Sequence, residues 1–269
     1  MDVMLGRQHL LLSVLTASLL LMIPMTLWNS SFLVPTLFGV IIGSLAPDAD
    51  SPDAAIFHKD VRGLKGSAKT LIFLFSQLFP AFGYTIKYAI YKPLVFLFRH
   101  LDKTGKINIP YEVKEDHRGL LHSLMGIFAS GVILTFYLTI FFLVFLKVDF
   151  TILVPFAFSF CLGAFLHLVE DSCTKSGVNY MFPFGDFSLS GNISTSNLED
   201  RRADFFTIAL VVANLLILFI SNYFLNAVIV LEVFVIFGTI LLWFIFMKFF
   251  AGVGRSSKHA SSRAVGNSA

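Results

Sequence analysis

Six long apolar runs, joined by polar connections, constrain the fold of this chain more than any other feature of its sequence. They cover residues 10–28, 32–46, 124–146, 150–169, 205–225 and 227–249. An α-helix rises 1.5 Å per residue, so roughly 20 apolar residues are enough to cross the hydrocarbon core of a bilayer. The first run is too long for a signal-peptide core and lacks a small-residue cleavage site, so we interpret it as structure. The runs therefore predict about six transmembrane helices.

The composition agrees with a membrane protein. Hydrophobic residues make up 56% of the chain and charged residues only 14%, whereas about a quarter of an average soluble domain is charged. Cys161 lies inside the fourth run and Cys173 just beyond its end, too far apart along a helix to form a disulfide. Gly39 and Gly43 in the second run offer a small-residue face for helix packing. We therefore expect an all-α polytopic membrane protein whose partner is the lipid bilayer, and we expect no nucleic acid to bind.

The long connection 53–116 is expected to be an interfacial or cytoplasmic insertion in a single membrane-embedded domain, residues 1–250. Within it, the stretch 71–98 is apolar but contains Lys87 and Lys92, and two short spans would have to bury both lysines at a high cost. We therefore expect one or two amphipathic helices that lie on the bilayer surface. The Ser-, Ala- and Arg-rich tail, residues 251–269, is expected to be disordered and basic.

The positive charges are distributed unevenly between the two faces that six spans define. Of the 20 Lys and Arg residues, only Lys147 falls on one face. Cytoplasmic loops carry an excess of Lys and Arg, so the opposite face is assigned to the cytoplasm. The sequence thus predicts a multi-pass protein of the cell membrane (inner or plasma membrane) with both termini in the cytoplasm.

His167 and Asp171 stand four residues apart at the end of the fourth run, on one face of a helix and one turn from each other. With six spans, further histidines and aspartates reach the same membrane surface: His9, Asp48, Asp50, His58, His117 and His122. Ionisable residues at the ends of membrane helices are expensive and usually functional. Imidazoles and carboxylates suit Zn, Mn, Fe or Ni, so we expect a metal site at the cytoplasmic interface.

Several neighbouring residues are candidates for other roles. Arg118 can hold a phosphate oxygen, or it can simply anchor the chain at the membrane surface. Glu170, next to Asp171 and about 100° further round the helix, is a candidate base. His117 and His122 are five residues apart and can face one point only if His117 precedes the helix. Cys173 is a further candidate ligand, although a thiol without a role is the simpler interpretation.

Four blocks of residues resemble the YdjM-like family of membrane-bound metal-dependent hydrolases, and they occur in the family's order. The blocks are Gln8–Ser13, Leu45–Asp50, His117–Ser123 and Gly163–Gly177, with a weaker fifth at residues 197–199. The resemblance implies that the metal ligands are His9, Asp48, Asp50, His117, His122, His167 and Asp171. The family also looks distantly similar to zinc-dependent phospholipase C, which implies phosphoester hydrolysis. The chain departs from the family at Ser51, where a His is frequent, and at Leu121, where a Thr is frequent; His58 is a possible substitute ligand.

These observations predict a metal-dependent hydrolase that acts on a phosphoester or lipid-linked substrate. The cofactor is expected to be one or more divalent ions, zinc in the first place, with Mn, Fe or Ni as alternatives. Glu170 and Arg118 are the candidate catalytic residues. A metal-ion or solute transporter is one alternative, although transporter sites lie near the bilayer midplane. A non-enzymatic scaffold with a closed, structural metal site is the other.

Overall fold

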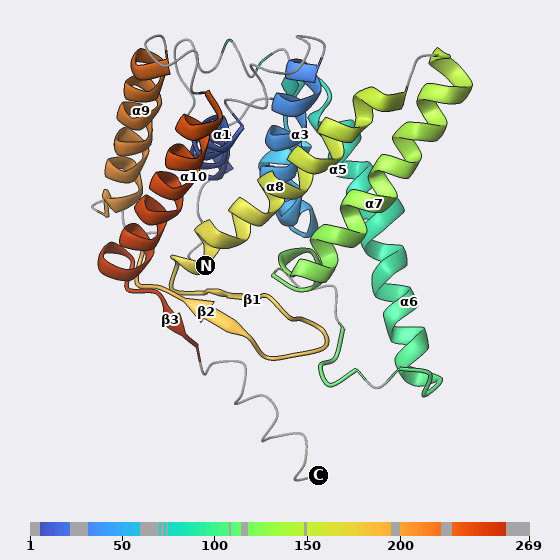
Figure 1. Cartoon of the computed structure of the whole chain (residues 1–269). Helices are drawn as coiled ribbons and strands as arrows, with labels where there is room; N and C mark the ends of the chain where they lie inside the picture. The colour runs from blue at the N-terminus through green and yellow to red at the C-terminus, as the bar shows by residue number, and fades with distance from the viewer. Residues whose placement is uncertain are drawn as a thin grey trace.

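The computed structural model describes residues 6–21, 32–59, 75–107, 109–113, 118–147, 150–194, 200–221 and 228–256, together with positions 70 and 73. This part of the chain is a bundle of helices with a small sheet at one end (Figure 1). Among the predicted site residues, His117 lies outside the described part, as do residues 257–269 of the tail.

Four helical segments are long and apolar enough to cross a membrane: Leu124–Phe145, Phe150–Ser172, Arg202–Ser221 and Val230–Phe250. They correspond to the helices α7 (Leu124–Phe141), α8 (Leu153–Ser172), α9 (Arg202–Ser221) and α10 (Val228–Ile245). Short helical turns extend three of them: η6 (Phe142–Leu146) follows α7, η7 (Phe150–Ile152) precedes α8, and η9 (Phe246–Phe250) follows α10. The buried share is 56% for the segment that contains α8 and 17–22% for the other three. Because α8 is the central helix, its side chains can be reached from several neighbours at once.

The first two predicted spans are the helices α1 (Gly6–Leu20) and α3 (Leu33–Leu45), with 15 and 13 residues in the described part. Both are shorter than a full crossing, so the count of six spans stays a prediction. The small-residue face predicted on α3 is confirmed: a Cβ at Gly43 would lie 2.1 Å from the carbonyl oxygen of Phe160 on α8. A Cβ at Gly163 of α8 would in turn lie 2.4 Å from the carbonyl oxygen of Val40. The backbones of α3 and α8 are therefore in direct contact.

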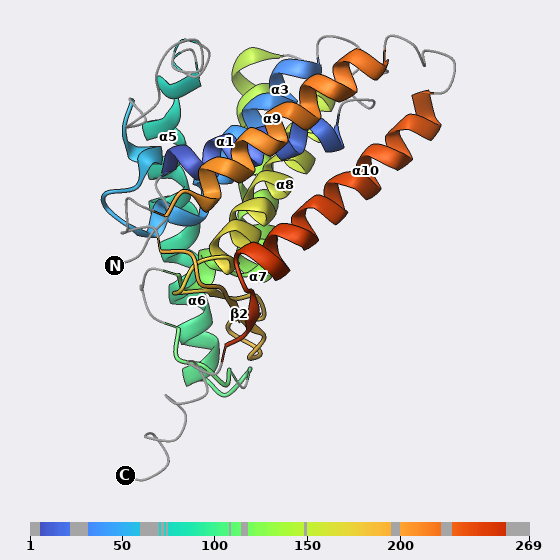
Figure 2. The ribbon, with the colours of Figure 1, turned by 90° about the vertical axis from the view of Figure 1, so that its left-hand side faces the viewer.

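The stretch predicted to be amphipathic forms one helical path: α5 (Phe79–Tyr84), the π-helical η4 (Thr85–Tyr91) and α6 (Lys92–Lys103). This path contacts α7 at η4, where the Tyr137 hydroxyl donates to the carbonyl oxygen of Ala89 at 3.2 Å. In both views α6 then extends past the sheet (Figures 1 and 2). The helical character is as expected. The path runs along the bundle, however, from Phe75 and Leu78 beside the starts of α3 and α8 to α6 past the sheet (Figure 1). Its place relative to the bilayer stays a prediction.

Short elements cap the end of the bundle at which α3 and α8 finish. They are the 3₁₀ turns η2 (Pro47–Asp50), η3 (Ala55–Phe57) and η5 (Leu120–His122), and the strands β1 (Val178–Asn179), β2 (Ser188–Ser190) and β3 (Gly254–Arg255). The strands form an antiparallel sheet in the order β1-β2-β3. The strand β3 lies within the tail for which the sequence predicts disorder, and its pairing with β2 orders residues 254–255 there.

Candidate metal centre

Three histidines from three separate elements meet at this end of the bundle. His9 lies on α1, His122 closes η5, and His167 lies in the last two turns of α8; all three are completely buried. The rings of His9 and His167 stack with their centroids 3.9 Å apart, and the rings of His122 and His167 meet edge-on at 5.3 Å. Residues more than 100 positions apart in the chain thus share one small polar space.

Each of these imidazoles has an oxygen atom on its Nδ1 side. The pairs are His9 with Glu170 Oε2 at 2.6 Å, His122 with Asp50 Oδ2 at 3.4 Å, and His167 with the carbonyl oxygen of Ser44 at 2.7 Å. Histidines that bind metals usually donate their other ring nitrogen to a carboxylate or a backbone carbonyl, which fixes the tautomer and the ring orientation. The three Nε2 atoms are thereby directed toward one another. The carboxylates of Glu170 and Asp50 therefore lie on the Nδ1 side of the imidazoles, away from the space that the Nε2 atoms share.

Two carboxylates complete a ring of four donor atoms with His122 and His167. The distances around it are 3.5 Å from His122 Nε2 to Asp48 Oδ1, 3.6 Å from Asp48 Oδ1 to His167 Nε2, 3.8 Å from His167 Nε2 to Asp171 Oδ2, and 3.6 Å from Asp171 Oδ2 to His122 Nε2. In a tetrahedral site, ligands about 2.0–2.2 Å from a zinc ion lie about 3.3–3.6 Å from each other. Three of these four distances lie in this range and the fourth exceeds it by 0.2 Å, so the four atoms are close enough together to be candidate ligands.

Hydrogen bonding points to the same centre. His9 Nε2, Asp48 Oδ1, His167 Nε2 and Asp171 Oδ2 are buried and have no hydrogen-bond partner. A buried polar atom without a partner costs about 1–3 kcal/mol, and a bound cation would satisfy all of them. His9 also lies 3.7 Å from the second oxygen of Asp171. Two groups of three residues have donor atoms close enough to hold an ion, Asp48 with His122 and His167, and His9 with His167 and Asp171, and they share His167. The donor set can hold one ion or two adjacent ions.

Arg118 holds the Asp171 carboxylate in place from outside this space. Its Nη2 donates to Asp171 Oδ1 at 2.9 Å, and its Nη1 donates to Thr174 Oγ1 and to the carbonyl oxygen of Gly177, both at 3.3 Å. The backbone N–H of Arg118 donates to Asp50 at 3.1 Å, with φ at +65°. The guanidinium thus connects the segment before α7 to the turn after α8, and its predicted contact with a substrate phosphate stays a prediction.

The electrostatics of the two groups outside the membrane helices follow from this arrangement. Burial alone would lower the pKa of His122, but the carboxylates of Asp50 and Asp48 raise that pKa to about 10. Burial alone would raise the pKa of Asp48, but the nearby imidazoles of His167 and His122 hold that pKa below its usual range. In the metal-free protein the Asp48 carboxylate thus remains charged, as a cation ligand must be.

The structure brings eight of the predicted site residues together: His9, Asp48, Asp50, Arg118, His122, His167, Glu170 and Asp171. His58 is exposed, and in the described part of the chain neither His58 nor Cys173 belongs to a group able to hold a metal ion. The Cys173 thiol instead donates to the carbonyl oxygen of Val169 at 3.5 Å.

Two groups that support the site were not predicted from the sequence. Ser13 donates to Glu170 Oε1 at 2.9 Å, so that Glu170 is held by two residues of α1 one turn apart. The four-residue spacing of His9 and Ser13 is a signal that was present in the sequence. The carbonyl oxygen of Ser44 leaves no such signal, because a backbone atom can come from any residue type.

Comparisons with known proteins support the resemblance. The model of a family described as YdjM inner membrane protein matches residues 4–252, which include every described helix and the strands β1 and β2 but not β3. Neither the curated proteins nor the solved structures contain a match to this chain.

Proposed function

The chain belongs to the YdjM inner membrane protein family, and from this premise we propose that it is a membrane-bound, metal-dependent hydrolase of phosphoester or lipid-linked substrates. The observation that carries the proposal is the ring of four buried donor atoms with edges of 3.5–3.8 Å. Two imidazoles and two carboxylates form a donor set typical of hydrolytic metal sites.

The residues that would hold the first ion are Asp48, His122 and His167, and the adjacent group of His9, His167 and Asp171 would bind a second ion or enlarge the first site. Zinc suits this set best, and Mn, Fe or Ni also accept nitrogen and oxygen donors. When bound, such an ion lowers the pKa of a coordinated water to about 7 and polarises a phosphoryl or carbonyl oxygen.

The side chains of the protein have separate tasks at this centre. The three completely buried imidazoles exclude bulk water from one side, while Asp48 and Arg118 are each 11% exposed in their side chains. A substrate would therefore approach past η2 and the segment before η5. On this route Arg118 already neutralises part of the Asp171 charge and can also attract an anionic substrate group.

The position of the centre favours a substrate at the membrane surface. His167 and Asp171 lie in the last two turns of α8, and Asp48 and His122 lie on short turns outside the helices. Transporter sites, in contrast, lie near the bilayer midplane between broken helices. A headgroup or a phosphorylated compound at the bilayer surface would be within reach of the centre.

The test compares His167→Ala with His58→Ala in purified protein. Metal content is measured by plasma mass spectrometry, and hydrolysis is measured on a panel of phosphomonoesters, phosphodiesters and phospholipids. We expect His167→Ala to lose both metal and hydrolysis, because it removes a donor of both groups, and His58→Ala to keep both. Metal binding without any hydrolysis would favour a structural site, and full activity in His167→Ala would refute the proposal.

A further inference from the structure

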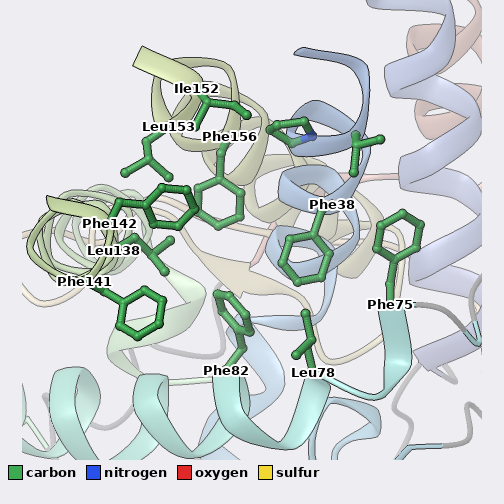
Figure 3. Close-up of a pocket in the computed structure, with 12 residues that line it drawn as sticks. Phe38, Phe75, Leu78, Phe82, Leu138, Phe141, Phe142, Ile152, Leu153 and Phe156 are labelled. Carbon is green, nitrogen blue, oxygen red and sulfur yellow. The ribbon is translucent and has the colours of Figure 1, made fainter. Parts of the chain in front are cut away.

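An apolar cleft of about 460 Å³ lies among α3, α5, α7 and α8 (Figure 3). Its volume is in the range of about 300–1,000 Å³ typical of ligand pockets. Every residue that lines it is apolar, and aromatic rings dominate: Phe38, Phe82 and Phe156 form its inner wall, with their ring centroids 5.2–6.3 Å apart. The cleft offers no polar group that could hold water or a charged molecule.

The cleft is at the end of the bundle opposite the candidate metal centre. The helix α3 contributes its first turns with Val34 and Phe38, whereas the metal-binding turn η2 follows its last residue. The helix α8 likewise contributes residues near its start, Leu153 and Phe156, whereas His167 is near its end. The two sites are therefore separated by most of the length of the bundle.

The cleft opens to the outer surface of the bundle. Three of its lining residues, Val34, Leu78 and Phe141, have exposed fractions of 58%, 50% and 47%. The neighbouring surface of α7 is also apolar, with Ile140 43% exposed. In a membrane protein such a surface faces lipid, so the cleft is continuous with the hydrocarbon region of the bilayer.

Apolar cavities stay dry and bind apolar molecules, and an empty one forfeits the dispersion contacts of its walls. Lipid chains are as apolar as leucine and are in contact with the opening. We propose that this cleft is a binding site for a hydrocarbon chain of a membrane phospholipid.

A charge near the cleft indicates which phospholipid fits best. Lys147 is exposed and directly follows η6, whose Phe142 lines the cleft. The next described element, η7, supplies Ile152 to the opposite wall. Lys147 is the described cation of the connection between these two walls, and Asp149 of the same connection lies outside the described residues. Basic residues attract anionic headgroups. A lipid with a negative headgroup, such as phosphatidylglycerol, would place its phosphate near this lysine and one chain in the cleft.

The test uses the full chain in nanodiscs that contain equal amounts of phosphatidylglycerol and phosphatidylethanolamine, followed by native mass spectrometry. Leu138→Trp fills the cleft from α7, while Ile140→Trp makes a comparable change two residues away on the exposed face. We expect wild type and Ile140→Trp to retain a single phospholipid and Leu138→Trp to lose it. We expect Lys147→Gln to retain a lipid but to lose the preference for phosphatidylglycerol.

A thermal titration keeps the proposal testable if Leu138→Trp does not fold. The unfolding midpoint of delipidated wild type should rise with added phosphatidylglycerol and saturate at one lipid per chain. Retention of the lipid by folded Leu138→Trp would overturn the proposal, because the cleft would then not be the site. Absence of both a retained lipid and a saturable rise in wild type would overturn it as well, and would indicate that the cleft is filled by the chain itself.

Discussion

Substitution of Gly43 by Ala tests whether the contact between α3 and α8 builds the metal centre. A Cβ at this position would lie 2.1 Å from the carbonyl oxygen of Phe160, whereas ordinary contacts begin at 3.4 Å. Since the opposing atom belongs to the backbone, no side chain can turn away, and the helices must separate locally by up to 1.3 Å. Overpacking of this kind costs about 1–3 kcal/mol of unfolding free energy.

The same separation would reach the metal donors. The carbonyl oxygen of Ser44, the residue after Gly43, accepts the 2.7 Å hydrogen bond from His167, and a shift of this size would break it. It would also lengthen the 3.6 Å distance between His167 Nε2 and Asp48 Oδ1, which is already at the upper limit of about 3.6 Å for tetrahedral zinc ligands. Loss of a partner that orients a ligand typically lowers metal affinity by about 10–100-fold.

The assay is a competition titration with a chromophoric zinc chelator, together with thermal unfolding in detergent. Gly238→Ala on α10 is the control, because a Cβ there meets nothing within 4 Å. The control should keep its zinc affinity and gain at most the helix propensity of alanine, about 1 kcal/mol.

We expect Gly43→Ala to have weaker zinc binding and a lower unfolding midpoint than both wild type and Gly238→Ala. Zinc affinity and an unfolding midpoint equal to those of Gly238→Ala would refute the reasoning. It would mean that α3 and α8 do not hold the donors at the distances described above.

Three further predictions follow from named contacts. Arg118→Ala should lower zinc affinity as well as any turnover, because the guanidinium holds Asp171 at 2.9 Å; unchanged zinc affinity in equilibrium dialysis would instead assign the arginine to substrate alone. Glu170→Gln should keep the fold but lower zinc affinity by about 10–100-fold through the imidazole that Glu170 orients, and a wild-type affinity in the same dialysis would contradict this. Lys147→Cys and Asp53→Cys should react with a membrane-impermeant maleimide from opposite sides of the membrane, and labelling of both from one side would overturn the predicted topology.

Helix content and the identity of the main site residues were available from the sequence. The helices α7, α8, α9 and α10 coincide with uninterrupted apolar runs. In hydrocarbon the backbone N–H and C=O groups of such a run must be hydrogen-bonded within the protein, and an α-helix does this within the run itself. The spacing of His167 and Asp171 places both on one helical face wherever α8 lies. Those inferences depend on local geometry, which the order of residues determines directly.

The roles of individual residues were less accessible. Glu170 was predicted as a base and Asp50 as a ligand, and the structure places both on the Nδ1 side of a histidine. A carboxylate has the same chemistry on the Nε2 side of an imidazole, where it would bind the ion, and on the Nδ1 side, where it would orient the ring. Composition and spacing therefore cannot distinguish the two positions. The sheet was also missed, because two- and three-residue strands are too short to show an alternating pattern.

The sequence by itself thus determined that the chain is helical, enters a membrane and carries histidines and aspartates at its helix ends. The tertiary structure decided which of their atoms meet, because the distances around the centre depend on backbones as far apart in sequence as His9 and His167. The tertiary structure also decided that Ser44 orients His167. The contact uses the backbone carbonyl group, which every residue possesses, so the residue type does not predict it. Contacts of this kind arise only when α3 and α8 approach to backbone contact, and that approach is a property of the packed bundle.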